Sequence, residues 1–189
     1  MWDKEGNDQK LCEGLSLLLK GHSNDLKTIE IKANKGDLLL KQGEPTNDLF
    51  LLKKGSVSVV IRSNEGISHL LTRLDSETLI GEMALFGVNK VSADVIVCSH
   101  TAELLKINGS ELLSAIMFDV EIATELLTLV CQRLQQSSEI IGLFMESINA
   151  IHSRNIELFD NATDKLSLKN DGFEILTKKL KDIYYNQNI

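Results

Sequence analysis

The sequence contains few of the residues that build disulfide frameworks, metal clusters or proline-rich linkers. It has one proline and three cysteines in 189 residues. The cysteines, Cys12, Cys98 and Cys131, are odd in number and do not have the spacing of a zinc site. We therefore expect no metal centre, and we interpret the cysteines as buried thiols in a reducing compartment.

Long apolar runs and an excess of positive charge are also missing. No stretch approaches the ~18 consecutive apolar residues of a membrane helix, and the N-terminus lacks the pattern of a signal peptide. The formal net charge is −7, whereas nucleic-acid binding needs a basic face. The local cluster of Lys178, Lys179 and Lys181 is interpreted as a solvated helix face. We expect a soluble, cytoplasmic protein that binds neither DNA nor a membrane.

Residues that would support catalysis are scattered along the chain. A metal-binding cupin needs a His-x-His pair with further ligands, and a nucleotide hydrolase needs a glycine-rich phosphate loop. Neither pattern occurs, and no serine or cysteine forms a recognisable pair with a histidine. The histidines are His22, His69, His100 and His152. We do not expect an enzyme.

Short apolar segments dominate the middle of the chain. Hydrophobic residues make up 43% of the sequence, enough for one domain with an appended element. Residues 56–59 (Ser-Val-Ser-Val) alternate as a half-buried strand requires. Many short strands with regular turn signals predict an α+β fold built on an antiparallel β-roll or jelly roll, a double-stranded β-helix, over residues 26–118. The expected turns fall at Gly36, Gly43, Gly55, Gly66 and Gly81.

Helical periodicity appears on both sides of this region. Leucines at helical spacing predict an N-terminal helix within residues 1–25. After the β-roll we expect a short helix capped by Ser110 and a long helix over residues 119–155 capped by Asp119. Residues 156–189 are expected to form a tail.

The long helix carries an apolar seam that steps by four and three residues. The seam comprises Ala123, Leu127, Val130, Leu134, Ser137, Ile141, Phe144, Ile148 and Ile151. Such a seam is typical of a helix that pairs with a second helix, although a helix packed on its own barrel would also be apolar. We favour a homodimer whose interface centres on Leu127, Val130, Leu134, Ile141, Phe144 and Ile148.

The tail is expected to contain a polar loop over residues 161–171 and then one amphipathic helix. Asp171 is the expected N-cap of that helix. Its apolar positions are Phe173, Leu176, Leu180, Ile183 and Tyr184. We expect this helix to present or mask a surface for a partner protein whose identity the sequence does not give.

The segment Gly81-Glu82-Met83-Ala84-Leu85-Phe86 is the most informative part of the sequence. A Gly-Glu turn that opens onto an apolar helical turn makes a compact anion pocket. Backbone N–H groups at the start of the helix point toward a phosphate, and the carboxylate accepts hydrogen bonds from a sugar hydroxyl.

This segment and its surroundings resemble the cyclic-nucleotide-binding domain family of the catabolite-activator type, over roughly residues 25–150. The resemblance implies the β-roll, the long dimer helix and cAMP as the first candidate ligand. The residues beyond the long helix are too few for the winged helix-turn-helix of that family's transcription factors. The resemblance is carried by residues 35–37 with 41–45, residues 49–57, the cassette at residues 81–93, and residues 133–139.

The resemblance implies a ligand site made of three groups of residues. Glu82 corresponds to the carboxylate that binds the ribose. Ser137 and Ser138 correspond to purine contacts, and Ser137 could equally set the register of the helix seam. The residues around the sugar and phosphate are Gly81, Met83, Ala84, Ser92 and Ala93.

The sequence departs from the family pattern at Val91, where the family usually has an arginine that pairs with the phosphate. Such a charged hydrogen bond is worth about 1.5–3 kcal/mol, or roughly 10- to 100-fold in affinity. Lys90 is adjacent but would point to the opposite face of a strand. Arg73 is a second cation of the β-roll, and Asp94 adds negative charge nearby. Three hypotheses follow: a stand-alone cyclic-nucleotide-sensing module, which we place first, a dimeric interaction scaffold with a degenerate pocket, or a site for a ligand other than a purine cyclic monophosphate.

Overall fold

A computed structural model describes residues 28–86 and 89–187 of the chain. The chain forms two compact units, and the division falls between Val130 and Cys131. The predicted N-terminal helix and Cys12 lie outside the described residues. No helix within the described ranges is long and apolar enough to cross a membrane.

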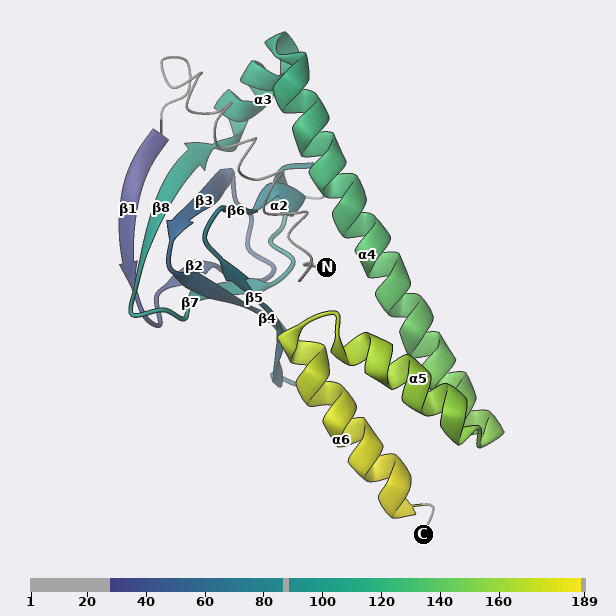
Figure 1. The fold of residues 1–189 in the computed structure, drawn as a ribbon. Coiled ribbons are helices and arrows are strands. Elements are labelled where there is room, and N and C mark those ends of the chain that lie inside the picture. The colour runs from purple at the N-terminus through teal and green to yellow at the C-terminus, as the bar shows by residue number, and fades with distance from the viewer. Residues whose placement is uncertain (1–27, 87–88, 188–189) are drawn as a thin grey trace. The chain divides into compact units, whose positions relative to one another are not determined.

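Two antiparallel sheets of four strands each form the predicted β-roll, as far as the described residues extend (Figure 1). The first sheet has the order β1-β8-β3-β6, with β1 at Thr28–Asn34, β8 at Thr101–Asn108, β3 at Asp48–Lys54 and β6 at Thr78–Ile80. The second has the order β2-β7-β4-β5, with β2 at Leu38–Leu40, β7 at Asp94–Val97, β4 at Ser56–Arg62 and β5 at Ser68–Asp75. The fold class predicted from the sequence is confirmed.

Helices lie between β6 and β7 and after β8 in the chain (Figure 1). Their bounds are α2 at Glu82–Phe86, α3 at Gly109–Phe118, α4 at Val120–Ser153, α5 at Ile156–Ser167 and α6 at Asp171–Gln187. The long helix predicted over residues 119–155 is therefore present as α4.

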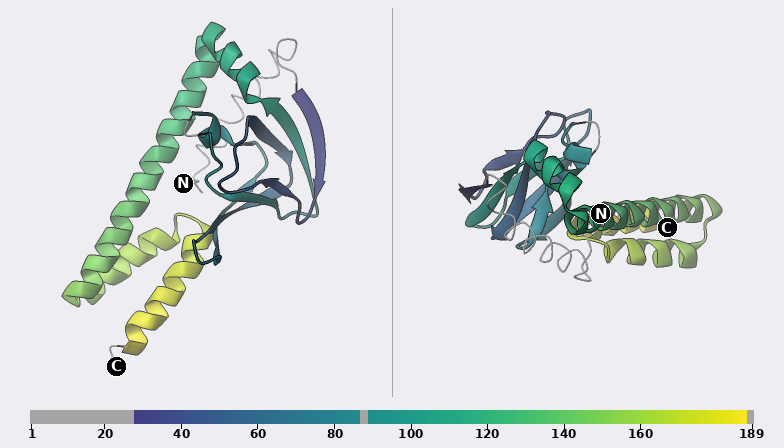
Figure 2. Two further views of the ribbon diagram at one scale, coloured as in Figure 1. Left: turned by 180° about the vertical axis from the view of Figure 1, so that it is seen from behind. Right: turned by 90° about the horizontal axis from the view of Figure 1, so that it is seen from above.

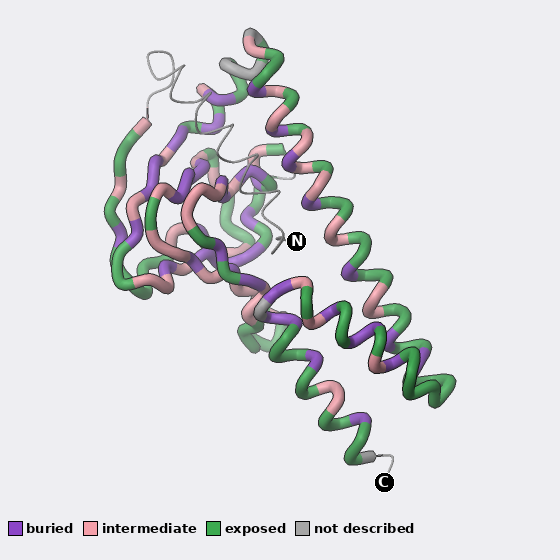
Figure 3. The backbone as a smooth tube through the Cα atoms, viewed as in Figure 1, coloured by how far each residue is buried: buried purple, intermediate pink, exposed green. Residues whose placement is uncertain are grey.

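Strand β3 of the first sheet is buried on both of its faces. Leu49 and Leu51 of β3 join a buried cluster with residues of α3 and the beginning of α4. The next residues along β3, Phe50 and Leu52, are also buried and point to the opposite face. This two-sided burial is typical of an unbroken apolar strand. Figure 3 shows buried residues along several strands of the β-roll, whereas the edge strand β1 is mostly exposed.

The five predicted turn glycines all have positive φ values, between 80° and 96°. Two of them also have close neighbours. A Cβ atom on Gly55 would lie 2.5 Å from the carbonyl oxygen of Thr101, and one on Gly81 would lie 3.0 Å from that of Asp48. Glycine is therefore required at both positions by backbone conformation and by space.

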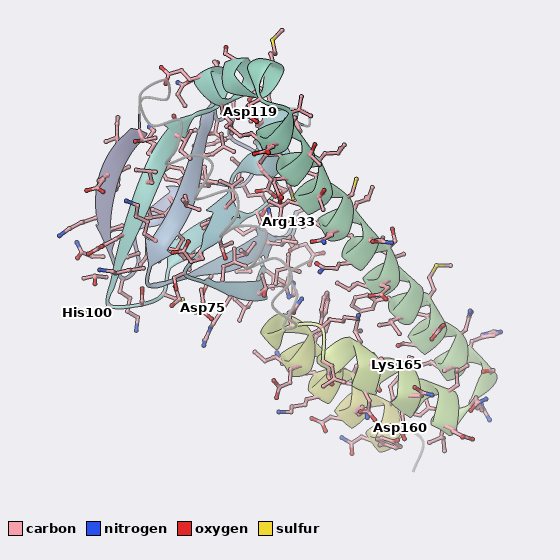
Figure 4. All side chains as sticks on the ribbon, turned by 45° about the horizontal axis from the view of Figure 1, so that its top comes forward. Asp75, His100, Asp119, Arg133, Asp160 and Lys165 are labelled. Carbon is pink, nitrogen blue, oxygen red and sulfur yellow. The ribbon has the colours of Figure 1, made fainter. Side chains whose placement is uncertain are left out.

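Helix capping agrees with the sequence at one helix and differs at another. Asp119 caps α4, because its Oδ1 accepts the N–H of Glu121 at 2.8 Å (Figure 4). Ser110 was the predicted cap of α3, which is wrong. The helix already begins at Gly109, so the side chain of Asn108 is the one that accepts the N–H of Ser110, at 2.9 Å.

The tail contains two helices, so the predicted loop over residues 161–171 is wrong. Residues 156–167 form α5, whose N-cap Asn155 accepts the N–H of Leu158 at 3.0 Å. The apolar stripe of α5 is narrow. Because polar residues separate its members, the sequence pattern did not indicate a helix there. Its buried members are Phe159, Ala162, Thr163 and Leu166. The cap of α6 is Asn170, whose side chain accepts the N–H of Phe173, whereas Asp171 was predicted.

Residues 131–187 build a small helical core of their own. The rings of Phe159 and Tyr184 lie 4.2 Å apart, and Ala150 of α4 belongs to the same buried cluster. Phe144 meets Phe173 edge to face at 5.4 Å. Phe144 therefore packs within its own chain, although the sequence had assigned it to the dimer interface.

The thiol prediction is only partly correct. Cys131 is exposed on α4, and Cys98 is half-buried. Both are free cysteines. The apolar environment expected for Cys131 is missing because its position on α4 faces solvent.

A charged network joins α5 to α6, which lie side by side (Figures 1 and 2). The Tyr185 hydroxyl donates to Asp160 at 2.7 Å, and Lys181 Nζ lies 2.8 Å from Asp164 and 3.2 Å from Asp160. The hydrogen bond from Tyr185 is the largest cause that lowers the pKa of Asp160. Burial lowers the pKa of Lys181, but its bonds to Asp164 and Asp160 outweigh this and raise it overall.

We expect Asp160→Asn to lower the thermal unfolding midpoint at neutral pH, because the amide cannot replace the charge that Tyr185 and Lys181 contact. A carboxylate with a lowered pKa stabilises the fold above its ordinary pKa, and this contribution is lost as the pH falls through the native value. The difference between variant and wild type should therefore shrink below about pH 4. Circular dichroism melts measure it, with Asp182→Asn, an exposed carboxylate on α6, as control. Equal effects of both variants would contradict the role of the network.

Candidate functional site

The Gly-Glu turn connects β6 to α2, inside the unit that holds the β-roll. Gly81 has a φ of 96°, and its carbonyl accepts the N–H of Ala84 at 3.1 Å, which closes the first turn of α2. Glu82 is only 1% exposed, so its carboxylate lies in the protein interior. Met83 is exposed, whereas Ala84 is buried. Burial of a carboxylate is costly unless polar groups surround it, which marks Glu82 as a functional candidate.

Val91 lies on the buried side of the strand entry that precedes β7. It is 7% exposed, and its backbone is held on both sides: its N–H donates to Glu44 at 2.9 Å and its carbonyl accepts from Gly43 at 2.8 Å. Ala93 is buried as well, whereas Lys90 and Ser92 are exposed. The wall at position 91 is therefore apolar, and the Lys90 side chain lies on the surface.

The structure brings the two parts of the predicted cassette together. The Ser92 hydroxyl lies 3.8 Å from the sulfur of Met83, so the strand entry faces the first turn of α2. Met83 and Ser92, separated in the sequence, thus lie next to each other.

An ion pair between the buried Asp94 and the exposed Arg62, next to this site, was missed by the sequence analysis. Asp94 is 5% exposed, and Arg62 Nη2 lies 2.6 Å from its Oδ2. Burial raises the pKa of Asp94, but hydrogen bonds from Arg62 and from the backbone N–H of Gln42 outweigh it and lower the pKa overall. Arg73, the cation considered from the sequence, is exposed on β5 and pairs in register with Ser58.

Ser137 and Ser138 belong to the other compact unit. Both hydroxyls donate to carbonyl groups of their own helix, that of Ser137 to Arg133 at 3.0 Å and that of Ser138 to Leu134 at 3.1 Å. Such bonds to the preceding turn are common for serine within helices. Their assignment as purine contacts stays a prediction.

One face of α4 carries large apolar side chains that are exposed to solvent. Leu127, Leu134, Ile141 and Ile148 are 64%, 67%, 59% and 63% exposed. Val130 and Phe144, also in the predicted interface, are half-buried. The exposed residues recur at every seventh position, which places them on one face of the helix.

Acidic, histidine and cysteine side chains do not gather into a metal site anywhere in the part of the chain that the structure describes. The chemistry available around α2 is therefore that of a buried carboxylate, backbone amides and an apolar wall.

Comparison with known proteins agrees with this geometry. Residues 30–118 match the family described as "Cyclic nucleotide-binding domain". The cAMP-activated global transcriptional regulator CRP of Salmonella typhimurium is 30% identical over 104 residues, which cover 55% of this chain and 50% of that protein. The chain thus spans about half the length of the curated relatives that it matches.

Two solved structures are similar in fold. The N-terminal domain of a transcriptional regulator from Streptomyces coelicolor A3(2) has a TM-score of 0.51 at 26% identity and covers 67% of this chain and 85% of its own. The Thermus thermophilus catabolite activator protein has a TM-score of 0.61 at 23% identity, over 74% of this chain and 63% of its own. Residues 30–118, which match the cyclic nucleotide-binding domain family, contain the Gly-Glu turn, α2 and the apolar wall at position 91.

Proposed function

We propose that the chain is a cyclic-nucleotide-sensing regulatory module that acts through a dimer and a partner protein. The observation that carries this proposal is the buried Glu82, which directly follows the positive-φ turn at Gly81. The next residue, Met83, lies beside Ser92 at the entry to β7. A carboxylate in that position can accept hydrogen bonds from a ribose hydroxyl. Because the similar regulator CRP of Salmonella typhimurium is cAMP-activated, cAMP is the first ligand to test.

Val91 sets the expected affinity. An apolar side chain cannot donate to a phosphate, so the site lacks one charge-assisted hydrogen bond worth about 1.5–3 kcal/mol. We therefore propose a weak cAMP site, roughly 10- to 100-fold weaker than one with an arginine at this position.

A direct contact supports a route from the ligand site to the helices. The backbone N–H of Gly109, the first residue of α3, donates to Asn47 at 2.6 Å. A Cβ atom on Gly109 would lie 2.6 Å from Leu85 Cδ1, so α2 rests directly on the start of α3. A ligand that shifts α2 would therefore shift α3 and bias the helix that follows.

The exposed face of α4 supports a homodimer. Leu127, Leu134, Ile141 and Ile148 form a solvent-facing stripe that a second copy of the helix would bury. The unidentified protein partner would then contact a surface whose position depends on the dimer. The tail helices α5 and α6 are the candidates for that surface.

A second candidate function is a dimeric interaction scaffold without a ligand. The buried, apolar Val91 favours it, because the wall that would face a phosphate offers no cation.

We expect Val91→Arg to raise the affinity for cAMP by about tenfold or more, because it supplies a guanidinium donor on the phosphate side. Glu82→Gln should lower any affinity, since an amide is a poorer acceptor than a carboxylate. Isothermal titration calorimetry with cAMP and cGMP measures both effects.

Thermal melts of each variant serve as the folding control for this experiment, because both positions are buried. Tight wild-type binding that is unaffected by Glu82→Gln would place the ligand elsewhere. The absence of binding in the wild type and in a folded Val91→Arg variant would favour the scaffold.

We expect Leu134→Glu with Ile141→Glu to convert a dimer into a monomer, because two charges per chain would be buried in the helix pair. Light scattering coupled to size exclusion measures the mass. Ile175→Glu, an equally polar change at an exposed apolar position of α6, is the matched control and should stay dimeric. A wild type that is monomeric at tens of micromolar would refute this interface, since weak dimers have dissociation constants of about that size.

We expect no sequence-specific DNA binding by this chain. Its net charge of −7 opposes phosphate contacts, and the outer face of α6 carries Ile175, Leu176 and Ile183. A gel shift with random and palindromic duplexes tests it, and a complex that survives salt and depends on sequence would overturn it.

A further inference from the structure

The ligand-facing segment is fastened to one loop by three hydrogen bonds. Val91 exchanges two backbone bonds with the loop, one with Gly43 at 2.8 Å and one with Glu44 at 2.9 Å. The N–H of the preceding residue, Gln42, donates to Asp94 Oδ1 at 2.7 Å. The loop that follows β2 thus holds both ends of residues 91–94.

Arg62 adds a third chain segment to this connection. Its guanidinium lies 2.7 Å and 2.6 Å from the two carboxylate oxygens of Asp94. Its backbone N–H donates to the Gln42 side chain at 2.7 Å, and its carbonyl accepts from the same side chain at 3.3 Å. Gln42, Arg62 and Asp94 therefore join the loop, the end of β4 and the start of β7.

Asp94, the first residue of β7, points to the opposite face of the second sheet from Val95. Val59 and Val95 pair in register and are both buried, so the next pair, Val60 and Asp94, points to the other face. The Asp94 carboxylate is engaged by Gln42 and Arg62 and can thus fix the backbone at the start of β7.

We propose that Asp94 and Arg62 are positioning residues that hold the segment Val91–Ala93 in its ligand-competent conformation before any ligand binds. This inference rests on the proposed function of the same site. In a site without an arginine at position 91, the phosphate contributes less binding free energy. Less of that free energy is then available to offset the cost of ordering the protein backbone. The segment must therefore be ordered by contacts within the protein.

The burial of Asp94 makes its two hydrogen-bond partners important for stability. Asp94 is 5% exposed and already satisfied by two partners, so loss of either partner leaves a buried charge incompletely paired. The effect should be local, because the cluster touches the loop and the strand entry and does not belong to the apolar cluster under α3.

Hydrogen exchange of the full chain without ligand tests the proposal. Asp94→Asn and Arg62→Met should each raise the exchange rate of peptides covering residues 41–46 and 89–95 by about tenfold or more, the value of one charged hydrogen bond. Glu30→Gln is the matched control, because it removes a charge from another ion pair of the β-roll, with Lys53 at 2.9 Å. Unchanged exchange in these peptides, or an equal rise throughout the β-roll, would overturn the proposal.

Titration with cAMP separates this inference from the proposed function. Asp94→Asn should weaken binding by about tenfold, and the reversed pair Arg62→Asp with Asp94→Arg should recover part of the loss. A gain in affinity with Asp94→Asn would overturn the positioning role, because it would mean that a released Arg62 binds the phosphate. If the wild type binds no cAMP, the proposed function fails, and the exchange experiment alone decides whether the pair orders the segment.

Discussion

The two-sided burial of strand β3 is the constraint on which the β-roll depends. Strand β3 places Leu49 and Leu51 against α3 and the start of α4, and it places Phe50 and Leu52 on the other face. Because side chains alternate along a strand, a shift of one residue would exchange these two sets. The register of β3 therefore fixes the position of its neighbours β6 and β8 and of the turn that follows β6.

The candidate site takes its geometry from that register. Strand β6 ends where Gly81 turns, and the backbone of Asp48 lies close enough to exclude a larger residue there. The same turn buries Glu82 and sets Leu85 against Gly109, the first residue of α3. The candidate site and the start of α3 are thus joined by direct packing of Leu85 on Gly109.

The two units differ in where their paired carboxylates and their apolar side chains lie. In the β-roll unit, Asp94 is neutralised by Arg62 and the strand entry stays apolar at Val91. In the helical unit, Asp160 is surrounded by donors from α6. The stripe that includes Leu134 remains exposed on α4, which is the surface that a second copy would cover.

The sequence by itself determined the β-roll, the long helix and the Gly-Glu turn, because strand alternation, positive-φ glycines and the Asp119 cap are encoded locally. Only the tertiary structure decided which distant groups meet. Arg62 reaches Asp94 across paired strands, and Phe144 meets Phe173 because the tail folds into two helices. No spacing rule within one segment reports such contacts, since they depend on the register of β4 against β7 and on the packing of α5 and α6.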